Sequence, residues 1–345
     1  MSSALPRADP ITQLPIVILE PHNRCNCRCL MCDIWLRSST QEVSSSDIEQ
    51  WLEEWRSLGV SRVMLTGGEP LMHSHLWKMC ESLRSAGIGI TLLSTGILLK
   101  RDATRLVQYC DHVIVSLDGP REIHNRIRNL AGAYEKLAEG VAAVRTADSS
   151  VLISGRCTVQ RANCRALAAT VAAAHDLGLD RISFLAADVS SEAFNRPDGW
   201  DVERTESVSL READLPLLVA ELDALEDGCR ADFASGYIEE TPTKLRRRLY
   251  QHSAALLGRG DFHPVDCNAP WVSTFIESDG SVRPCFFQPP LGNLRETGSL
   301  REILNSDEAI LWRRGLDMGR DEICRKCVCS LQFADSETSR EGCRR

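Results

Sequence analysis

The stretch Glu20-Pro21-His22-Asn23-Arg24-Cys25-Asn26-Cys27-Arg28-Cys29-Leu30-Met31-Cys32 follows the apolar run at residues 16–19. Its cysteines Cys25, Cys29 and Cys32 have the spacing C-x3-C-x2-C. A loop this short can place three thiolates around three irons of a cubane cluster, because thiolate sulfur is the soft ligand that iron–sulfur centres use. The fourth iron then keeps an open position. Because an open iron can bind a small molecule, the loop predicts a catalytic cluster rather than a purely structural metal site.

The same cysteines also allow a second interpretation, a zinc knuckle. Zinc would need a fourth ligand nearby, and either His22 or Cys27 could supply it. The triad alone does not choose between the two metals, and the motifs further along the chain favour the cluster. We treat Cys27 as a spare thiol, because its position inside the loop makes it a less suitable ligand.

Length and composition agree with an intracellular enzyme. A chain of 345 residues can bury one large core plus a smaller domain. The N-terminus lacks the apolar segment of a secretory signal, and no apolar run approaches membrane-spanning length. The 15 cysteines are therefore expected in the reducing cytoplasm, where metal binding is more common than disulfides. A net charge of -8 argues against a general nucleic-acid-binding surface.

Apolar runs alternate with amphipathic segments over the first two thirds of the chain. Helical spacing is clearest after Ser46, where Ile48, Trp51, Trp55 and Leu58 recur on one face. Strands that alternate with helices imply parallel βαβ units and right-handed crossovers. The six expected strands are 16–19, 62–66, 89–94, 112–117, 151–159 and 181–186. The sequence thus predicts an α/β fold, an open (β/α)6 partial TIM barrel with a small C-terminal α+β domain.

This pattern also gives expected domain boundaries. A tail at 1–14 precedes a barrel at 15–225, a helical linker at 226–265, an auxiliary domain at 266–334 and a polar tail at 335–345. In such barrels functional groups collect at the C-terminal ends of the strands. Four segments of small or polar residues occupy those positions: Gly67-Gly68-Glu69-Pro70, Ser94-Thr95, Ser116-Leu117-Asp118, and the cysteine loop itself. On the fifth strand, alternation places either Arg156 or Cys157, not both, toward the interior, where a cysteine could donate a hydrogen atom.

The cysteine triad followed by Gly-Gly-Glu-Pro resembles the radical S-adenosylmethionine (radical SAM) superfamily. The resemblance implies a 4Fe-4S cluster on Cys25, Cys29 and Cys32 whose open iron chelates SAM. One electron then cleaves SAM to a 5'-deoxyadenosyl radical that abstracts hydrogen from a substrate. It further implies SAM contacts by Gly67, Gly68, Glu69, Pro70, Ser94, Thr95, Ser116, Asp118 and Arg128. Alternative interpretations stay open for single residues: Ser94 and Thr95 could merely cap a helix, and Arg128 could be a solvated surface residue.

A second set of cysteines lies near the C-terminus. Cys267 precedes an expected hairpin at 272–285 that turns at Ser278-Asp279-Gly280, and Cys324, Cys327 and Cys329 follow after a gap. The arrangement C-x12-G-x4-C, then C-x2-C, resembles Twitch and SPASM auxiliary-cluster domains. It implies one auxiliary 4Fe-4S cluster on Cys267, Cys285, Cys324 and Cys327, with Cys329 as a competing ligand. A structural zinc ribbon on the same thiolates is the alternative.

The substrate is less well determined than the cofactors. The polar segments 187–215 and 236–266 are expected to supply its contacts, the first as a lid. The short N-terminal segment leaves no room for the winged-helix recognition domain of peptide maturases, which favours oxidation of a small polar metabolite. Peptide or protein modification is the alternative, and a non-enzymatic iron–sulfur electron carrier is the hypothesis from another class. The enzyme would also need an external one-electron donor such as flavodoxin or ferredoxin.

Overall fold

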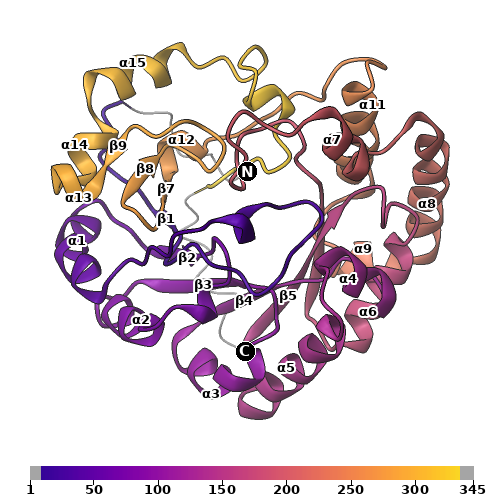
Figure 1. Ribbon diagram of the computed structural model, residues 1–345, viewed down its shortest axis with the longest axis horizontal. Coiled ribbons are helices and arrows are strands. Elements are labelled where there is room, and N and C mark those ends of the chain that lie inside the picture. Colours follow the sequence, from indigo (N-terminus) through magenta and orange to yellow (C-terminus); the bar gives the residue numbers. More distant parts are fainter. Residues whose placement is uncertain (1–8, 335–345) are drawn as a thin grey trace.

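Six parallel strands in sequence order form the centre of the computed structural model, which describes residues 9–334 (Figure 1). Three further strands continue the sheet beyond β1, in the order β6-β5-β4-β3-β2-β1-β7-β8-β9. The strands are β1 (Ile16–Leu19), β2 (Arg62–Leu65), β3 (Gly89–Ser94), β4 (His112–Ser116), β5 (Leu152–Val159), β6 (Arg181–Ala186), β7 (Ser273–Ile276), β8 (Ser281–Arg283) and β9 (Gly292–Asn293). The predicted α/β partial barrel is confirmed.

Helices α1 to α6 run between the parallel strands, and all of them except α4 contribute to the apolar core on the outer side of the curved sheet (Figure 1). They are α1 (Ser45–Ser57), α2 (Leu76–Ser85), α3 (Leu99–Tyr109), α4 (Arg121–Arg128), α5 (Ala133–Ala147) and α6 (Leu167–Asp176). The next group is α7 (Val202–Val208), α8 (Leu215–Gly228), α9 (Arg230–Ser235), α10 (Pro242–Leu245), a π-helical segment (Arg246–Gln251) and α11 (His252–Leu256). The last are α12 (Ala269–Val272), α13 (Leu294–Thr297), α14 (Leu300–Leu304) and α15 (Asp307–Gly315). Within residues 9–334 no helix is long and apolar enough to cross a membrane.

Helix α1 shows how the sequence pattern becomes structure. Its N-cap is Ser44, and the side chains of Ser44 and Asp47 form a capping box. Trp51 and Trp55 face the sheet, are almost completely buried and lie with their rings 6.0 Å apart. Burying such aromatic side chains contributes about 2 to 3 kcal/mol each. This packing, more than local propensity, fixes α1 against the strands.

The C-terminal elements share the barrel's sheet. Strand β7 pairs in parallel with β1, from Ile16 opposite Ser273 to Leu19 opposite Ile276. The hairpin β7–β8 and the short β9 then add antiparallel strands, so β1 is not an exposed edge. In Figure 1 the orange and yellow C-terminal elements lie beside β1 and α1. Helix α14 is fixed there because the Glu54 carboxylate accepts hydrogen bonds from Leu300 N (2.6 Å) and Ser299 Oγ (2.7 Å).

The alternation on β5 resolves one sequence question. Arg156 pairs with Ser116 and Ser183 on the neighbouring strands, whereas Cys157 pairs with Phe184. Cys157 and Phe184 are completely buried in the apolar core that also contains the helix residues Leu167 and Val171. Cys157 therefore faces the helix layer and Arg156 faces the other side of the sheet. The polar tail expected at 335–345 and most of the expected N-terminal tail lie outside the described residues.

Candidate active site

The loop after β1 brings the first three cysteines together. Cys29 is buried, and Cys25 and Cys32 are half-buried in the same apolar cluster as Ile127. The end of α4 holds the loop, because Arg28 N donates to the Arg128 carbonyl (3.2 Å) and Leu30 N donates to the Ile127 carbonyl (2.9 Å). The loop is thus anchored to a helix roughly a hundred residues away rather than by local turns alone.

The thiols of this loop differ in acidity. Burial raises the pKa of both Cys25 and Cys32 to about 12. A hydrogen bond from the Cys27 thiol, together with the nearby Arg128 guanidinium, lowers the pKa of Cys29 to about 7 despite its burial. The assignment of Cys27 as a spare thiol stays a prediction. Buried thiols of high pKa ionise when a metal replaces the proton, so the set fits a metal centre.

A single bound ion suits this loop less well than a cluster. Among residues 9–334, no group of three or more His, Cys, Asp or Glu side chains is placed to hold one metal ion. A cubane instead binds each thiolate through a different iron. His22, a possible zinc ligand, has both ring nitrogens engaged: Nε2 lies 2.6 Å from the Glu69 carbonyl oxygen, and Nδ1 accepts from Arg24 N (3.1 Å).

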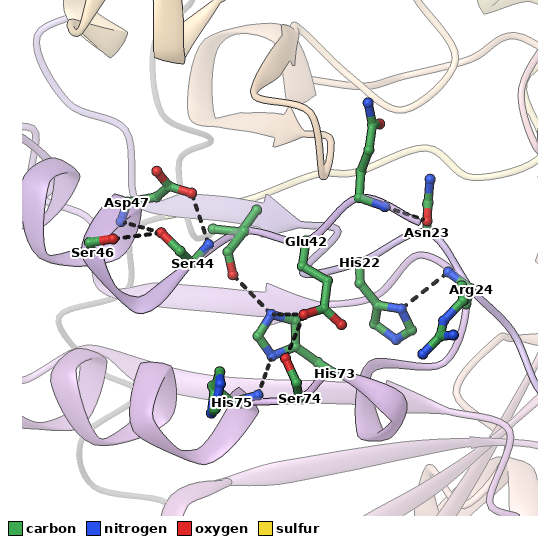
Figure 2. Close-up of polar contacts among 12 residues, drawn as sticks. His22, Asn23, Arg24, Glu42, Ser44, Ser46, Asp47, His73, Ser74 and His75 are labelled. Carbon is green, nitrogen blue, oxygen red and sulfur yellow. Dashed lines mark hydrogen bonds and ion pairs between the residues drawn. The ribbon is translucent and has the colours of Figure 1, made fainter. Parts of the chain in front are cut away.

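His22 has a close counterpart in His73, and Figure 2 shows the region around both rings. The Nε2 of His73 lies 2.9 Å from the Val43 carbonyl oxygen, and its Nδ1 accepts from the amide of His75 (3.0 Å). Both rings are buried, and burial lowers the pKa of each. Each is therefore a neutral imidazole that donates from Nε2 and accepts at Nδ1. Of these two histidines, it is His22 that connects the cysteine loop with the segment after β2.

The glycines after β2 pack against the cysteine loop. Gly67 has φ +105°, and a methyl group there would lie 2.4 Å from Cγ of Glu20. A methyl group on Gly68 would lie 1.9 Å from the Arg24 carbonyl oxygen, which instead accepts a hydrogen bond from Glu69 N at 2.8 Å. The absence of side chains at Gly67 and Gly68 is therefore required by the approach of two protein segments.

The Glu69 carboxylate joins the ends of β2 and β3. It is fully buried and accepts from Leu71 N (3.1 Å), Ser94 Oγ (2.9 Å), Thr95 N (2.6 Å) and Thr95 Oγ1 (2.5 Å). Burial raises the pKa of this carboxyl group, and the four donors oppose that shift. Ser94 and Thr95 are not the N-cap of α3, which begins at Leu99. They position Glu69 beside the cysteine loop.

Asp118 and Arg128 form a buried ion pair next to Cys29. Arg128 Nη2 lies 2.6 Å from Asp118 Oδ2, and Nη1 donates to Cys29 Sγ at 3.6 Å. Asp118 Oδ1 accepts from Thr158 N (3.0 Å). Arg128 is therefore not a solvated surface residue. Its Nε and the Nδ2 of Asn26 are buried donors without a partner among the described residues, so both fit a ligand that offers oxygen acceptors, such as SAM.

Part of the segment expected to be a lid, residues 188–200, lies against the cysteine loop and is called the strap here. Arg196 Nη2 donates to the Met31 carbonyl (2.6 Å), and its Nη1 contacts Asp188 Oδ2 at 3.1 Å. The Arg196 guanidinium also lies 3.8 Å from the centre of the Trp200 ring. Asn195 Nδ2 donates to the Asp33 carbonyl at 2.9 Å. Sequence reasoning missed Asp33 and the role of Arg196, since no local pattern connects these distant segments.

The C-terminal cysteines also converge. Cys267, Cys285 and Cys324 share an apolar cluster with Met318 and Trp271. Several N–H groups donate to sulfur: Ala269 N and Leu331 N to Cys267 (both 3.4 Å), Gln288 Nε2 to Cys324 (3.4 Å) and Cys329 N to Cys327 (3.3 Å). Such donors tune iron–sulfur clusters, so the set fits an auxiliary cluster. Cys329 is exposed, unlike the four expected ligands.

Comparisons with known proteins match both segments that contain these cysteines. The radical SAM superfamily profile matches residues 19–161, and that of the SPASM iron–sulfur cluster-binding domain matches residues 267–328. An AdoMet-dependent heme synthase of Methanosarcina barkeri is 26% identical over 330 residues, 89% of this chain and 87% of that protein. A PqqA peptide cyclase of Bradyrhizobium diazoefficiens is 25% identical over 90% of this chain and 78% of its own.

Solved structures show the same fold. Streptococcus suis SuiB bound to S-adenosylmethionine superposes with a TM-score of 0.63 at 14% identity, covering 92% of this chain and 72% of that chain. Native anSMEcpe with bound AdoMet has a TM-score of 0.63 at 21% identity, covering 86% and 82%. At these identities the likeness concerns the fold alone.

Proposed function

Because the chain belongs to the radical SAM superfamily and carries a SPASM-type iron–sulfur domain, we propose that it abstracts hydrogen from an organic substrate and oxidises or otherwise modifies it. The cofactors of this family are a SAM-binding 4Fe-4S cluster, SAM and an auxiliary iron–sulfur cluster. When bound, they supply one electron, the cleavage of SAM and the radical that takes the hydrogen atom. The proposal rests on one observation: the cysteine loop, the Gly67–Pro70 segment and the Asp118–Arg128 pair meet at one end of the sheet.

The residues of this site have distinct proposed roles. Cys25, Cys29 and Cys32 hold the SAM-binding cluster. Arg128 offers positive charge beside Cys29 and a free Nε donor toward an acceptor on SAM. Glu69, positioned by Ser94 and Thr95, and the backbone of Gly67, Gly68 and Pro70 form the wall where the SAM amino group would bind. Ser116, half-buried at the end of β4, and Asp118 complete the proposed SAM contacts.

The strap at 188–200 protects this site from water. It is held to the cysteine loop by side chain–backbone hydrogen bonds and by Arg196 stacked on Trp200. Excluding water from a radical centre prevents side reactions and strengthens the electrostatic contacts inside. We propose a permanent cover rather than a mobile lid for this segment.

The auxiliary cluster is proposed to bind Cys267, Cys285, Cys324 and Cys327 and to accept an electron during oxidation of the substrate. Its domain is attached to the strand that carries the first loop, since β7 pairs with β1. An external donor such as flavodoxin or ferredoxin would deliver the first electron. The substrate is proposed to be a small metabolite, and the similarity to PqqA peptide cyclases along 90% of the chain supports peptide modification as the second candidate.

The test is anaerobic reconstitution followed by incubation with SAM and dithionite. Wild type should bind about eight irons and release 5'-deoxyadenosine, whereas the Cys25→Ala/Cys29→Ala/Cys32→Ala variant should bind about four and release none. Electron paramagnetic resonance should show a SAM-perturbed signal only in wild type. Release of no 5'-deoxyadenosine by reduced wild type would contradict the proposal and favour an electron carrier.

A further inference from the structure

A cavity of about 540 Å³ lies at the C-terminal ends of β5 and β6, beside the proposed active site. The strap and α7 form one side of it and α11 the other. Its lining is mainly apolar and includes Val159, Ala187, Val208, Leu256 and Leu257. A volume of this size suits a small-molecule ligand.

The cavity shares a wall with the cysteine loop. Ala187 and Val208 line the cavity and also belong to the apolar cluster that contains Cys29 and Met31. The wall is held by two backbone hydrogen bonds, Ala187 N to the Val159 carbonyl (2.8 Å) and Arg161 N to the Val208 carbonyl (2.9 Å). Ala187 and Val208 thus connect the cavity lining with the apolar cluster around the cysteine loop, which places a bound ligand on the side of the molecule where the radical chemistry is proposed.

Two buried polar side chains in the lining have unsatisfied groups. Gln160 is 1% exposed, and its Nε2 has no hydrogen-bond partner among the described residues. His252 is 2% exposed, and its Nδ1 likewise has none. The Gln160 backbone is fixed, because its N–H donates to Asn163 Oδ1 (2.7 Å) and its carbonyl accepts from Cys164 N (2.9 Å). Buried polar groups without partners cost free energy, so the pair is suited to a ligand that satisfies it.

The chemistry of the pair defines the ligand. The free Nε2 of Gln160 is an N–H donor, and the free Nδ1 of a neutral His252 imidazole is a donor or an acceptor according to its tautomer. The charged lining residues Glu206, Arg211 and Glu212 are exposed, so they belong to the margin of the cavity. An ionised group inside would lose its hydration without a charged partner. An uncharged group with an apolar body and an amide-like edge would satisfy both side chains.

We propose that this cavity binds the uncharged, amphipathic part of the substrate, with Gln160 and His252 as its polar anchors. That the ligand is the substrate rests on the proposed function. That the cavity binds a ligand of this kind does not. It narrows the expected small polar metabolite, or the alternative peptide, to a molecule that carries an apolar ring or chain next to a carbonyl or amide.

The test uses benzamide as the probe, with benzoate and toluene as charged and apolar counterparts, titrated into the reconstituted protein by ligand-observed NMR. Benzamide should bind about tenfold more tightly than either counterpart, equal to about 1.4 kcal/mol. Gln160→Leu and His252→Phe should each remove that preference and keep toluene binding, and Leu257→Trp should fill the cavity and abolish binding. Gln251→Leu, one residue before His252 and outside the lining, is the matched control and should bind like wild type.

Equal binding of benzamide and toluene by wild type, or an unchanged preference in Gln160→Leu and His252→Phe, would overturn the anchoring roles. No binding of benzamide would overturn the ligand site. The distance of the ligand from the first cluster is tested by reducing the clusters. The NMR signals of bound benzamide should then broaden more in wild type than in the Cys25→Ala/Cys29→Ala/Cys32→Ala variant. Equal broadening in the two proteins would overturn the substrate role. The same samples are assayed for 5'-deoxyadenosine. Its absence in wild type with intact benzamide preference would contradict the proposed function but leave the ligand site standing.

Discussion

Replacing His22 with phenylalanine should weaken the connection between the cysteine loop and the segment after β2, leaving the backbone bond from Glu69 N to the Arg24 carbonyl. The ring is retained, but two hydrogen bonds are lost, one to the buried Glu69 carbonyl (2.6 Å) and one from the partly exposed Arg24 amide (3.1 Å). A buried carbonyl left without a donor costs about 1 to 3 kcal/mol, and a partly exposed amide about 1 kcal/mol. The free energy of unfolding should therefore fall by about 3 kcal/mol.

His73→Phe is the matched control for this experiment. His73 also has one bond to a buried carbonyl and one from a partly exposed amide two residues on, so its loss should cost about the same 3 kcal/mol. Its bonds do not reach the cysteine loop. Urea unfolding of the metal-free proteins should thus show equal losses, while only His22→Phe should lower the iron content from about eight toward four and reduce the yield of 5'-deoxyadenosine.

A third variant, His22→Gln, keeps a donor near the position of Nε2 and should give intermediate values for stability and for 5'-deoxyadenosine. The reasoning fails if His22→Phe loses stability but retains full iron content and SAM cleavage. It fails equally if His73→Phe impairs SAM cleavage as strongly as His22→Phe, because the effect would then follow from general destabilisation.

Three further predictions concern other parts of the chain. Gly68→Ala forces a methyl group to within 1.9 Å of the Arg24 carbonyl oxygen, so the free energy of unfolding should fall by about 3 kcal/mol and the first cluster should be lost. Gly59→Ala, where the methyl group would meet nothing within 4 Å, should cost about 1 kcal/mol and keep all iron. Urea unfolding and iron analysis check both variants. Cys329→Ala should retain about eight irons, and a fall to about four would make Cys329 an auxiliary ligand. Burial lowers the pKa of His252 to about 4, so the unfolded chain takes up a proton first as the pH falls below 6.5. Between pH 7 and pH 5 wild type should therefore lose about 2 kcal/mol more than His252→Gln in urea unfolding of the metal-free proteins, and equal losses would contradict this pKa.

Much of the fold could be predicted because buried parallel strands have a simple sequence pattern. The first strand, residues 16–19, and the sixth, residues 181–186, have the predicted bounds, since each is a short apolar run beside turn residues. The second and fourth strands end one residue earlier than predicted, at Leu65 and Ser116, because the last residue of a strand depends on its pairing with the neighbouring strands. Element type was thus easier to predict than its boundary.

The candidate site was predictable in part for a related reason. Cysteine spacing is a local property, so the loop at 25–32 could be identified from the sequence, although its ligation remains a proposal. The hydrogen bonds that hold this loop are long-range: His22 to Glu69, Arg196 to Met31 and Arg128 to Cys29. In each bond the two residues lie far apart in the sequence, and no sequence pattern links them. Such contacts become visible only when the fold brings the segments together.

The pairing of β7 with β1 gives the second cysteine set a mechanical relation to the first. The Glu20 carboxylate, at the end of β1, accepts from Arg37 Nη1 (2.9 Å) and from Ser278 Oγ (3.2 Å) in the β7–β8 turn. Glu20 N also donates to the Ile276 carbonyl (2.9 Å). A hinge between the two cysteine sites would have to break these bonds as well as the β1–β7 ladder. The proposed electron relay therefore requires no domain closure, because one continuous sheet fixes the distance between its two centres.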